Sequence, residues 1–309
     1  MFDLTVRKPK VLLIGNGLSR AYNAESWDCF LDSINRKKEE FPTPKDIVDM
    51  PMSLRIILLT ENHVRTAMKE NKEYFLKEFY EKLDKGINQE IRKLFSCGFD
   101  YILTTNYSYE LEYSIYGNSL TESRLKNEVQ RYIEVDRAET KYMLHTFNHI
   151  VSDGKETDIW HIHGEARKPD SMIIGSDYYS RLSYRIIEEL GKIDYDKKDG
   201  MDFNKVVVRN WPEAILFGDV YVLGFGYDYC EQDLWWLLCR KANETRIKVG
   251  KTFFYEPNEG SKNRAKKSLL NVFGVVTDNL DLGYSGEINY KDYYRDAIND
   301  IVQRIEGNV

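Results

Sequence analysis

A run of apolar residues that leads directly into a glycine turn constrains this chain more than any other stretch. Residues 10–27 read KVLLIGNGLSRAYNAESW, in which residues 11–14 predict a buried strand and Gly15 and Gly17 a turn into a helix. Glycine lets backbone approach a phosphate closely, and the free N–H groups of a first helical turn attract anions. We therefore expect a phosphate or nucleotide site here, the alternative being a turn that simply connects a strand to a helix.

The rest of the chain alternates strands with helices. A helical pattern runs over residues 26–39. Residues 40–97, approximately, show only helical periodicity and predict an all-helical insertion that includes a charge-rich helix at residues 69–85. Residues 178–217 predict further helical segments. Further strands are expected at residues 99–104, 159–163, 172–174, 220–223, 251–255 and 274–276. This order predicts the α/β class, as one domain over residues 1–309 with a doubly wound, mostly parallel, Rossmann-like sheet.

Four of the expected strands end in polar or glycine-rich clusters, which read GNGLS, TTN, HIHG and GFGYD. The carboxyl ends of parallel strands meet at one edge of a sheet, and ligands of such sheets bind there. We therefore expect the four clusters to converge on one crevice.

The glycine turn lacks two features of a dinucleotide-dependent dehydrogenase. Arg20 stands where the third glycine of the dinucleotide fingerprint would be, and no acidic strand end follows about 20 residues later. Hydride transfer is therefore disfavoured. Ser19 and Arg20 could meet phosphate oxygens, or else be a helix cap and a surface charge.

Asn106 and two histidines carry the side chains best suited to chemistry. Asn106 follows Thr105 at a strand end and could hold ribose hydroxyls or a water, or else cap the following helix. His163 precedes Gly164 at another strand end, where a general base would meet a ligand. His161, two residues earlier on the same face of the strand, is expected to be structural, and without a third ligand of suitable spacing no metal site is expected.

Several further side chains have alternative interpretations. Asp177 and Asp228 are candidates for the rim of the crevice, whereas Asp233 is expected to cap the helix that follows it. Three tryptophans, Trp27, Trp235 and Trp236, are expected in the core.

Charge and cysteine content limit the function classes. The 309 residues carry a net charge of −6, which argues against a sequence-independent nucleic-acid binder. The four cysteines form no CxxC pair and are expected to be buried or half-buried thiols in a reducing cytosol. We see no secretory signal and no membrane-spanning run, and we expect a cytoplasmic protein.

Taken in order, the four strand ends resemble the sirtuin-like NAD-binding domains of prokaryotic antiphage defence proteins. The resemblance rests on GNGLSR with Ser26 and Trp27 downstream, FDYILTTNYSYELE, IWHIHGEARKPDSMIIGSDYY and VYVLGFGYDYCEQDLWWLL. It covers residues 11–31, 99–112, 159–179 and 220–238, approximately, and leaves the helical insertion aside.

The resemblance implies cleavage of NAD, as substrate, to nicotinamide and ADP-ribose, with no metal, in abortive infection through NAD depletion. It implies that Asn106 contacts the nicotinamide ribose and that His163 is the catalytic base. The residues that we expect to contact the nucleotide are Gly15, Asn16, Gly17, Ser19, Arg20, Thr105, Gly164, Asp177, Gly224, Phe225 and Gly226.

Three positions depart from the family pattern. Ser108 replaces a common Asp, Asn16 replaces a small residue, and Asn23 replaces a glycine, although asparagine tolerates a left-handed backbone. The zinc-binding cysteine pairs of protein-deacylating sirtuins are absent, which favours simple hydrolysis.

Control of such an activity is expected from a homo-oligomer or from a separately encoded defence partner, with residues 45–95 as the contact surface. The alternatives are a nucleotide sensor that does not cleave, another abortive-infection family with a similar pattern, and a nucleic-acid-binding defence scaffold. The acidic isoelectric point, near 5.6, counts against the last of these.

Overall fold

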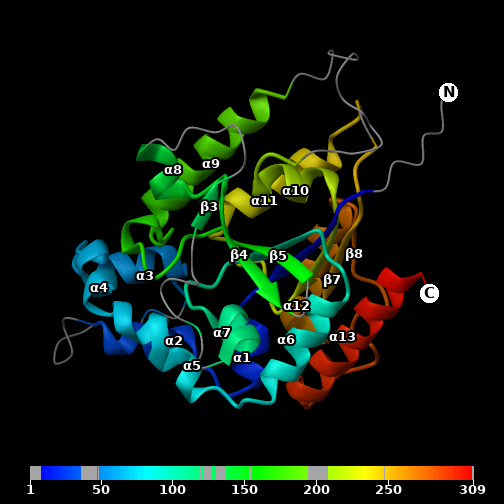
Figure 1. Ribbon diagram of the computed structural model, residues 1–309, viewed down its shortest axis with the longest axis horizontal. Helices are drawn as coiled ribbons and strands as arrows, with labels where there is room; N and C mark the ends of the chain where they lie inside the picture. The colour runs from blue at the N-terminus through cyan, green and yellow to red at the C-terminus, as the bar shows by residue number, and fades with distance from the viewer. Residues whose placement is uncertain are drawn as a thin grey trace.

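Eight strands form one sheet in the computed structural model, in the order β3-β4-β5-β2-β1-β6-β7-β8 (Figure 1). The structure describes residues 8–35, 47, 49–117, 120, 127–129, 137–152, 155–193, 208–246 and 248–307. The strands are β1 (Lys10–Ile14), β2 (Tyr101–Thr104), β3 (Asn127–Val129), β4 (Thr146–Ser152), β5 (Lys155–His161), β6 (Asp219–Leu223), β7 (Thr252–Tyr255) and β8 (Val275–Val276). The expected mostly parallel α/β sheet is therefore confirmed.

The first strand lies in the middle of the parallel part of the sheet. It pairs in parallel with β2 on one side and with β6 on the other. Its residues 11–14 are at most 2% exposed, as an apolar strand covered on both faces requires. The chain moves outward from β1 first toward β2 and later toward β6, so the sheet reverses its winding between β1 and β6, where ligands of such sheets bind. Only the outer edge is antiparallel, formed by β3, β4 and β5.

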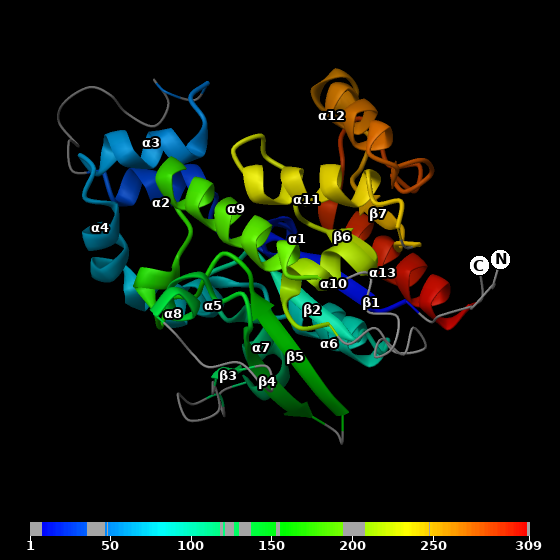
Figure 2. The ribbon, with the colours of Figure 1, turned by 90° about the horizontal axis from the view of Figure 1, so that it is seen from above.

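Helices cover both faces of this sheet (Figure 2). The longer ones are α6 (Ile87–Ser96), α9 (Ser176–Gly191), α11 (Gln232–Ala242), α12 (Ser261–Val272) and α13 (Tyr290–Glu306). The shorter ones are α1 (Asn16–Ala21), α2 (Trp27–Ser33), α3 (Met52–Leu59), α4 (Val64–Glu70), α5 (Phe79–Lys82), α7 (Glu110–Tyr116), α8 (Arg137–Tyr142) and α10 (Trp211–Phe217). A π-helical turn, η1 (Tyr74–Glu78), and a 3-10 turn, η3 (Pro169–Ser171), complete the described helices.

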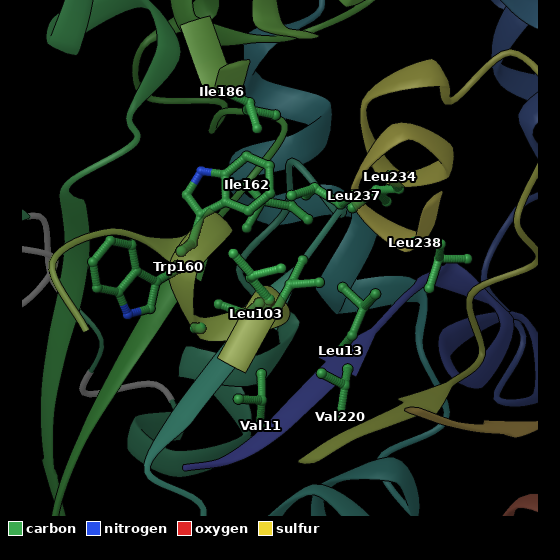
Figure 3. Packing of buried hydrophobic residues seen from close by; sticks show 14 of the residues in the cluster. Val11, Leu13, Leu103, Trp160, Ile162, Ile186, Val220, Leu234, Leu237 and Leu238 are labelled. Atoms are coloured by element: carbon green, nitrogen blue, oxygen red, sulfur yellow. The ribbon is translucent and has the colours of Figure 1, made fainter. Parts of the chain in front are cut away.

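Strand alternation sends side chains into two separate apolar layers. Val11 and Leu13 point toward α9, α10 and α11, into an apolar layer that also contains Leu234 and Leu237 (Figure 3). Leu12 points to the opposite face, into a layer completed by α1, α6, α7 and α13. Burial of these layers drives folding and fixes the register of β1.

The helical insertion has an apolar core of its own. The sequence predicts no strand in the insertion, and residues 49–97 contain none. Helices α2, α3 and α4 gather on the side of the molecule away from α12 and α13 (Figure 1). Their core includes Phe30, Ile56 and Phe75, and it joins the rest of the chain through Tyr107 and Met172. The insertion thereby lies beside the carboxyl end of β2.

Four expected elements differ from those observed. The prediction of a strand at residues 172–174 is wrong. This fully buried apolar run connects two cores and pairs with no described strand of the sheet. The strand expected at 159–163 ends at His161, and His163 lies in the turn that follows the strand. The helix expected at 26–39 ends at Ser33, with residues 36–39 outside the described part, and the one expected at 69–85 breaks after Glu70.

The cysteines and helices bear on two other expectations. Cys230 is buried and Cys97 half-buried, but Cys29 and Cys239 are exposed, which corrects the expectation of four covered thiols. In the part of the chain that the structure describes, every helix is too short or too polar to span a bilayer.

Candidate active site

The four strand-end clusters surround one cavity of about 810 Å³. It opens at the carboxyl edge of the parallel strands, where β1 and β6 lie side by side. Among the residues expected to form the site, the cavity is lined by Asn16, Gly17, Arg20, Thr105, Asn106, His163, Gly224, Phe225 and Gly226. The volume falls within the range that holds a small-molecule ligand or cofactor.

Four other expected residues lie outside the lining. Gly15 and Gly164 serve close backbone packing: a Cβ on Gly15 would lie 2.7 Å from the Gly224 carbonyl oxygen, and Gly164 has a φ of +89°. Ser19 is buried inside α1, and Asp177 is exposed and paired with Arg181. Binding by these four residues stays a prediction.

The glycines of the β1–α1 turn pack against the loop that follows β6. The N–H of Gly17 donates to the carbonyl oxygen of Gly224 at 2.7 Å, and a Cβ on Gly17 would lie 2.5 Å from Oη of Tyr294. Gly224 itself adopts a φ of +66°. The two glycine motifs therefore need each other for close approach, and the Gly17 N–H is already engaged within the protein.

His163 forms a buried pair with Asp233. Its Nε2 lies 2.9 Å from Oδ2 of Asp233, and both side chains are almost wholly shielded from solvent. The Tyr179 ring meets the imidazole edge to face, with 5.4 Å between centroids. Because the carboxylate holds Nε2, the other nitrogen, Nδ1, is left to accept a proton from a ligand.

The expectation that Asp233 caps a helix is wrong. Helix α11 begins at Gln232, its N-cap is Glu231, and no side chain caps it. Asp233 lies inside the first turn, from which its carboxylate reaches across to His163. Its Oδ1 is buried without a hydrogen-bond partner.

Asn106 is fixed by Glu110, the first residue of α7. Its Nδ2 donates to Oε1 of Glu110, and Oγ of Ser108 donates to the other oxygen of the same carboxylate at 2.6 Å. The carboxylate only accepts, so it sets the orientation of the amide and leaves Oδ1 of Asn106 for a ligand. Burial raises the pKa of Glu110, although the hydrogen bonds from Ser108 and Asn106 oppose that rise.

The helical insertion and the α2 segment supply an aromatic wall near Asn106. Trp27 meets Tyr107 at 5.8 Å between ring centroids, and Phe75 meets Tyr107 at the same distance. Phe30 packs against Phe75 at 4.9 Å, and all four rings line the cavity. Trp27 is half-buried at the cavity, and Trp235 and Trp236 are half-buried against the core, so the expectation of three core tryptophans is corrected.

The other end of the cavity, beyond β7, is charged. Glu256 pairs with Lys266 at 2.7 Å and accepts from Nδ2 of Asn263. Lys266 also donates to the carbonyl oxygen of Gly226, which ties this end to the loop after β6. Arg20 is exposed at the cavity and can approach an anion there.

Sequence reasoning did not assign Asp233, Glu110 or Trp27 to the site. Glu110 lies four residues after Asn106, at the start of α7, which is a spacing that sequence inspection can recognise. Asp233 carries no comparable signal, because 70 residues separate it from His163. In the described part of the chain, no group of three or more His, Cys, Asp or Glu side chains could hold a metal ion.

No protein-family model matches this sequence, and no curated protein matches it either.

Proposed function

We propose that this chain is a sirtuin-like NAD glycohydrolase that cleaves NAD to nicotinamide and ADP-ribose. One observation carries the proposal: His163, whose ring is held by Asp233, and the fixed amide of Asn106 line the same cavity. A base with a carboxylate behind it and an oriented polar group beside it suit the hydrolysis of an N-glycosidic bond.

In the proposed reaction, the bond between C1′ of the ribose and the nicotinamide nitrogen breaks. The electron pair of that bond neutralises the pyridinium, and positive charge develops on the ribose. Oδ1 of Asn106 orients the ribose or the water. His163 takes a proton as the water oxygen adds to C1′, and the proton then passes to solvent, so NAD and water give nicotinamide, ADP-ribose and a proton.

The lining of the cavity supports one direction for the dinucleotide. The nicotinamide lies at the aromatic wall, where Trp27 and Phe75 can bind a planar cationic ring. The phosphates lie near Arg20, because the Gly17 N–H already donates to Gly224. The adenosine lies along the Gly224–Phe225–Gly226 loop, within reach of Glu256, whose carboxylate suits ribose hydroxyls.

The biological role that we propose is antiphage defence by abortive infection, in which the enzyme exhausts cellular NAD. Such an activity has to be restrained until a phage is present. We assign the restraint to a homo-oligomer or to a separately encoded partner that contacts the helical insertion. Because the insertion supplies Phe75 and Met52 to the cavity, movement of the insertion would change the site directly.

A nucleotide sensor that binds without cleaving is the second candidate. It is favoured by the engaged Gly17 N–H, which leaves fewer backbone donors for phosphates than an open glycine turn offers. The test is to incubate the purified chain with NAD and to follow free nicotinamide. Release of nicotinamide supports the enzyme, whereas NAD binding without release supports the sensor.

A further inference from the structure

A second histidine–carboxylate pair lies directly behind Asn106. Nε2 of His161 is 2.9 Å from Oε1 of Glu112, and Nδ1 of the same ring is 2.8 Å from the backbone carbonyl oxygen of Asn106. Both side chains are at most 1% exposed. His161 therefore joins the end of β5 to the loop after β2, at the residue that presents its amide to the cavity.

Both partners of His161 are acceptors. A backbone carbonyl oxygen cannot donate, and Oε1 of Glu112 also accepts from Nδ2 of Asn148 at 3.0 Å, as expected of an ionised carboxylate. A neutral imidazole has only one N–H, so it could satisfy only one of these two acceptors. With Glu112 as a carboxylate, this geometry points to a proton on each nitrogen and hence a positive charge on His161.

The charges around His161 support this protonation state. Glu112 faces it from α7 and Glu165 from the loop after β5, while Tyr109 contributes a ring with its centroid 5.3 Å away. Burial by itself would lower the pKa of His161, but the charge and hydrogen bond of Glu112, with Glu165 in support, raise it to about 9. A charged imidazolium here is consistent with the surplus of buried carboxylates.

Asn106 is consequently held at three of its polar atoms. Its N–H donates to Oγ1 of Thr104 at 3.1 Å, its carbonyl oxygen accepts from His161, and its Nδ2 donates to Glu110. If Nδ1 of His161 lost its proton, the lone pair of Nδ1 would face the carbonyl oxygen of Asn106 and repel the backbone there.

We propose that His161 is a positioning residue, which as an imidazolium held by Glu112 fixes the backbone carbonyl of Asn106 and thereby aims the Asn106 amide into the cavity. The link to catalysis rests on the proposed NAD cleavage, whereas the protonation and the coupling to Asn106 do not. A displacement of the amide by about 1 Å is enough to lower cleavage by about 100-fold.

Nuclear magnetic resonance tests the protonation of His161 and its coupling to Asn106 without reference to activity. In protein labelled at histidine and asparagine nitrogens, His161 is identified by the signals that His161→Gln removes. We expect both ring nitrogens of His161 to carry protons at neutral pH, and the Asn106 side-chain amide signal to shift in step with His161 as the pH rises through about 9. A neutral His161 at neutral pH, or an Asn106 signal that ignores its titration, would overturn the proposal.

Steady-state kinetics add a readout that a merely structural role would not move. In Glu112→Gln the high-pH limb of kcat for nicotinamide release should move to lower pH, and His161→Gln should lower kcat by about 100-fold with a smaller change in KM. The matched control is His149→Gln, which removes another histidine–carboxylate pair, His149–Asp158, on the outer strands. An unmoved limb in Glu112→Gln would contradict the proposal. A wild-type chain that neither binds nor cleaves NAD would refute the proposed function, while the resonance measurement would still decide the positioning.

Discussion

Nε2 of His163 lies 2.9 Å from Oδ2 of Asp233, although 70 residues separate the two in the chain. The pair joins the turn after β5 to the first turn of α11, across β2, β1 and β6. The carboxylate holds Nε2 of His163 and thereby fixes the imidazole ring, which leaves Nδ1 for a ligand.

Asp233→Asn should lower kcat for NAD cleavage by about 100-fold, the scale of a general base contribution. The amide still accepts from Nε2, but it no longer stabilises the positive charge that His163 gains. Kinetics and a thermal unfolding curve on the same preparation separate activity from folding. The matched control is Asp158→Asn, which weakens the half-buried pair with His149 and should leave kcat unchanged. Equal effects of the two substitutions would contradict a positioning role for Asp233.

The contribution of His161 to the free energy of unfolding, measured as the difference between the wild type and His161→Gln, should fall as the pH rises from about 6.5 to about 9, because His161 binds a proton more tightly in the folded chain. Its stabilisation is fully present below its unfolded pKa and is lost as the pH rises through its folded pKa. The maximum loss is about 3 kcal/mol, from the size of this shift. Urea unfolding at several pH values checks this, and His161→Gln should lose that part of the slope. An identical slope in the variant would show that His161 does not titrate as described.

Gly17→Ala should destabilise the chain by about 1–3 kcal/mol, because the new Cβ has no space between Tyr294 and the backbone of Gly224. NAD cleavage should fall with it, since the two glycine loops would separate. Urea unfolding gives the free energy, and nicotinamide release gives the activity. Gly191→Ala is the matched control, because a Cβ there meets no atom within 4 Å. A fully stable and active Gly17→Ala would show that the close approach is unnecessary.

Trp27→Ala should raise KM for NAD by about tenfold, the scale of one aromatic contact to a cationic ring. It should also weaken product inhibition by nicotinamide, because the neutral ring loses the same aromatic surface. Trp27→Phe should preserve most of both, because it keeps an aromatic face on the wall. Inhibition by added nicotinamide measures the effect directly. If Trp27→Ala leaves this inhibition unchanged, the nicotinamide does not bind at the aromatic wall.

Local sequence signals were enough to predict most of the sheet. Strands β1, β2 and β6 are short apolar runs that end in glycine or polar residues, and alternation with helices indicates a parallel order. The run at residues 172–174 has the same local pattern but lies between two cores. Periodicity cannot distinguish a buried connector from a strand, so tertiary context decided that case.

The candidate site was predictable where its residues end strands. Asn106 and His163 both line the cavity because they follow β2 and β5, two neighbouring parallel strands whose carboxyl ends lie at the same edge of the sheet. Asp233 was assigned as a cap because capping is a local interaction, whereas its pairing with His163 depends on how α11 packs over the sheet. The left-handed Asn23, with a φ of 69°, agrees with the expectation for a position where glycine is usual. Whether these residues bind and cleave NAD stays a prediction.

Release of free nicotinamide from NAD by the purified chain tests the central claim most directly. It is measured for the wild type, His163→Ala and Asn106→Ala at matched folded concentrations, with and without candidate partners. The account predicts release by the wild type and its loss in both variants, which should still be folded at the assay temperature. Undiminished release by folded His163→Ala, or no release by the wild type under any of these conditions, would contradict it.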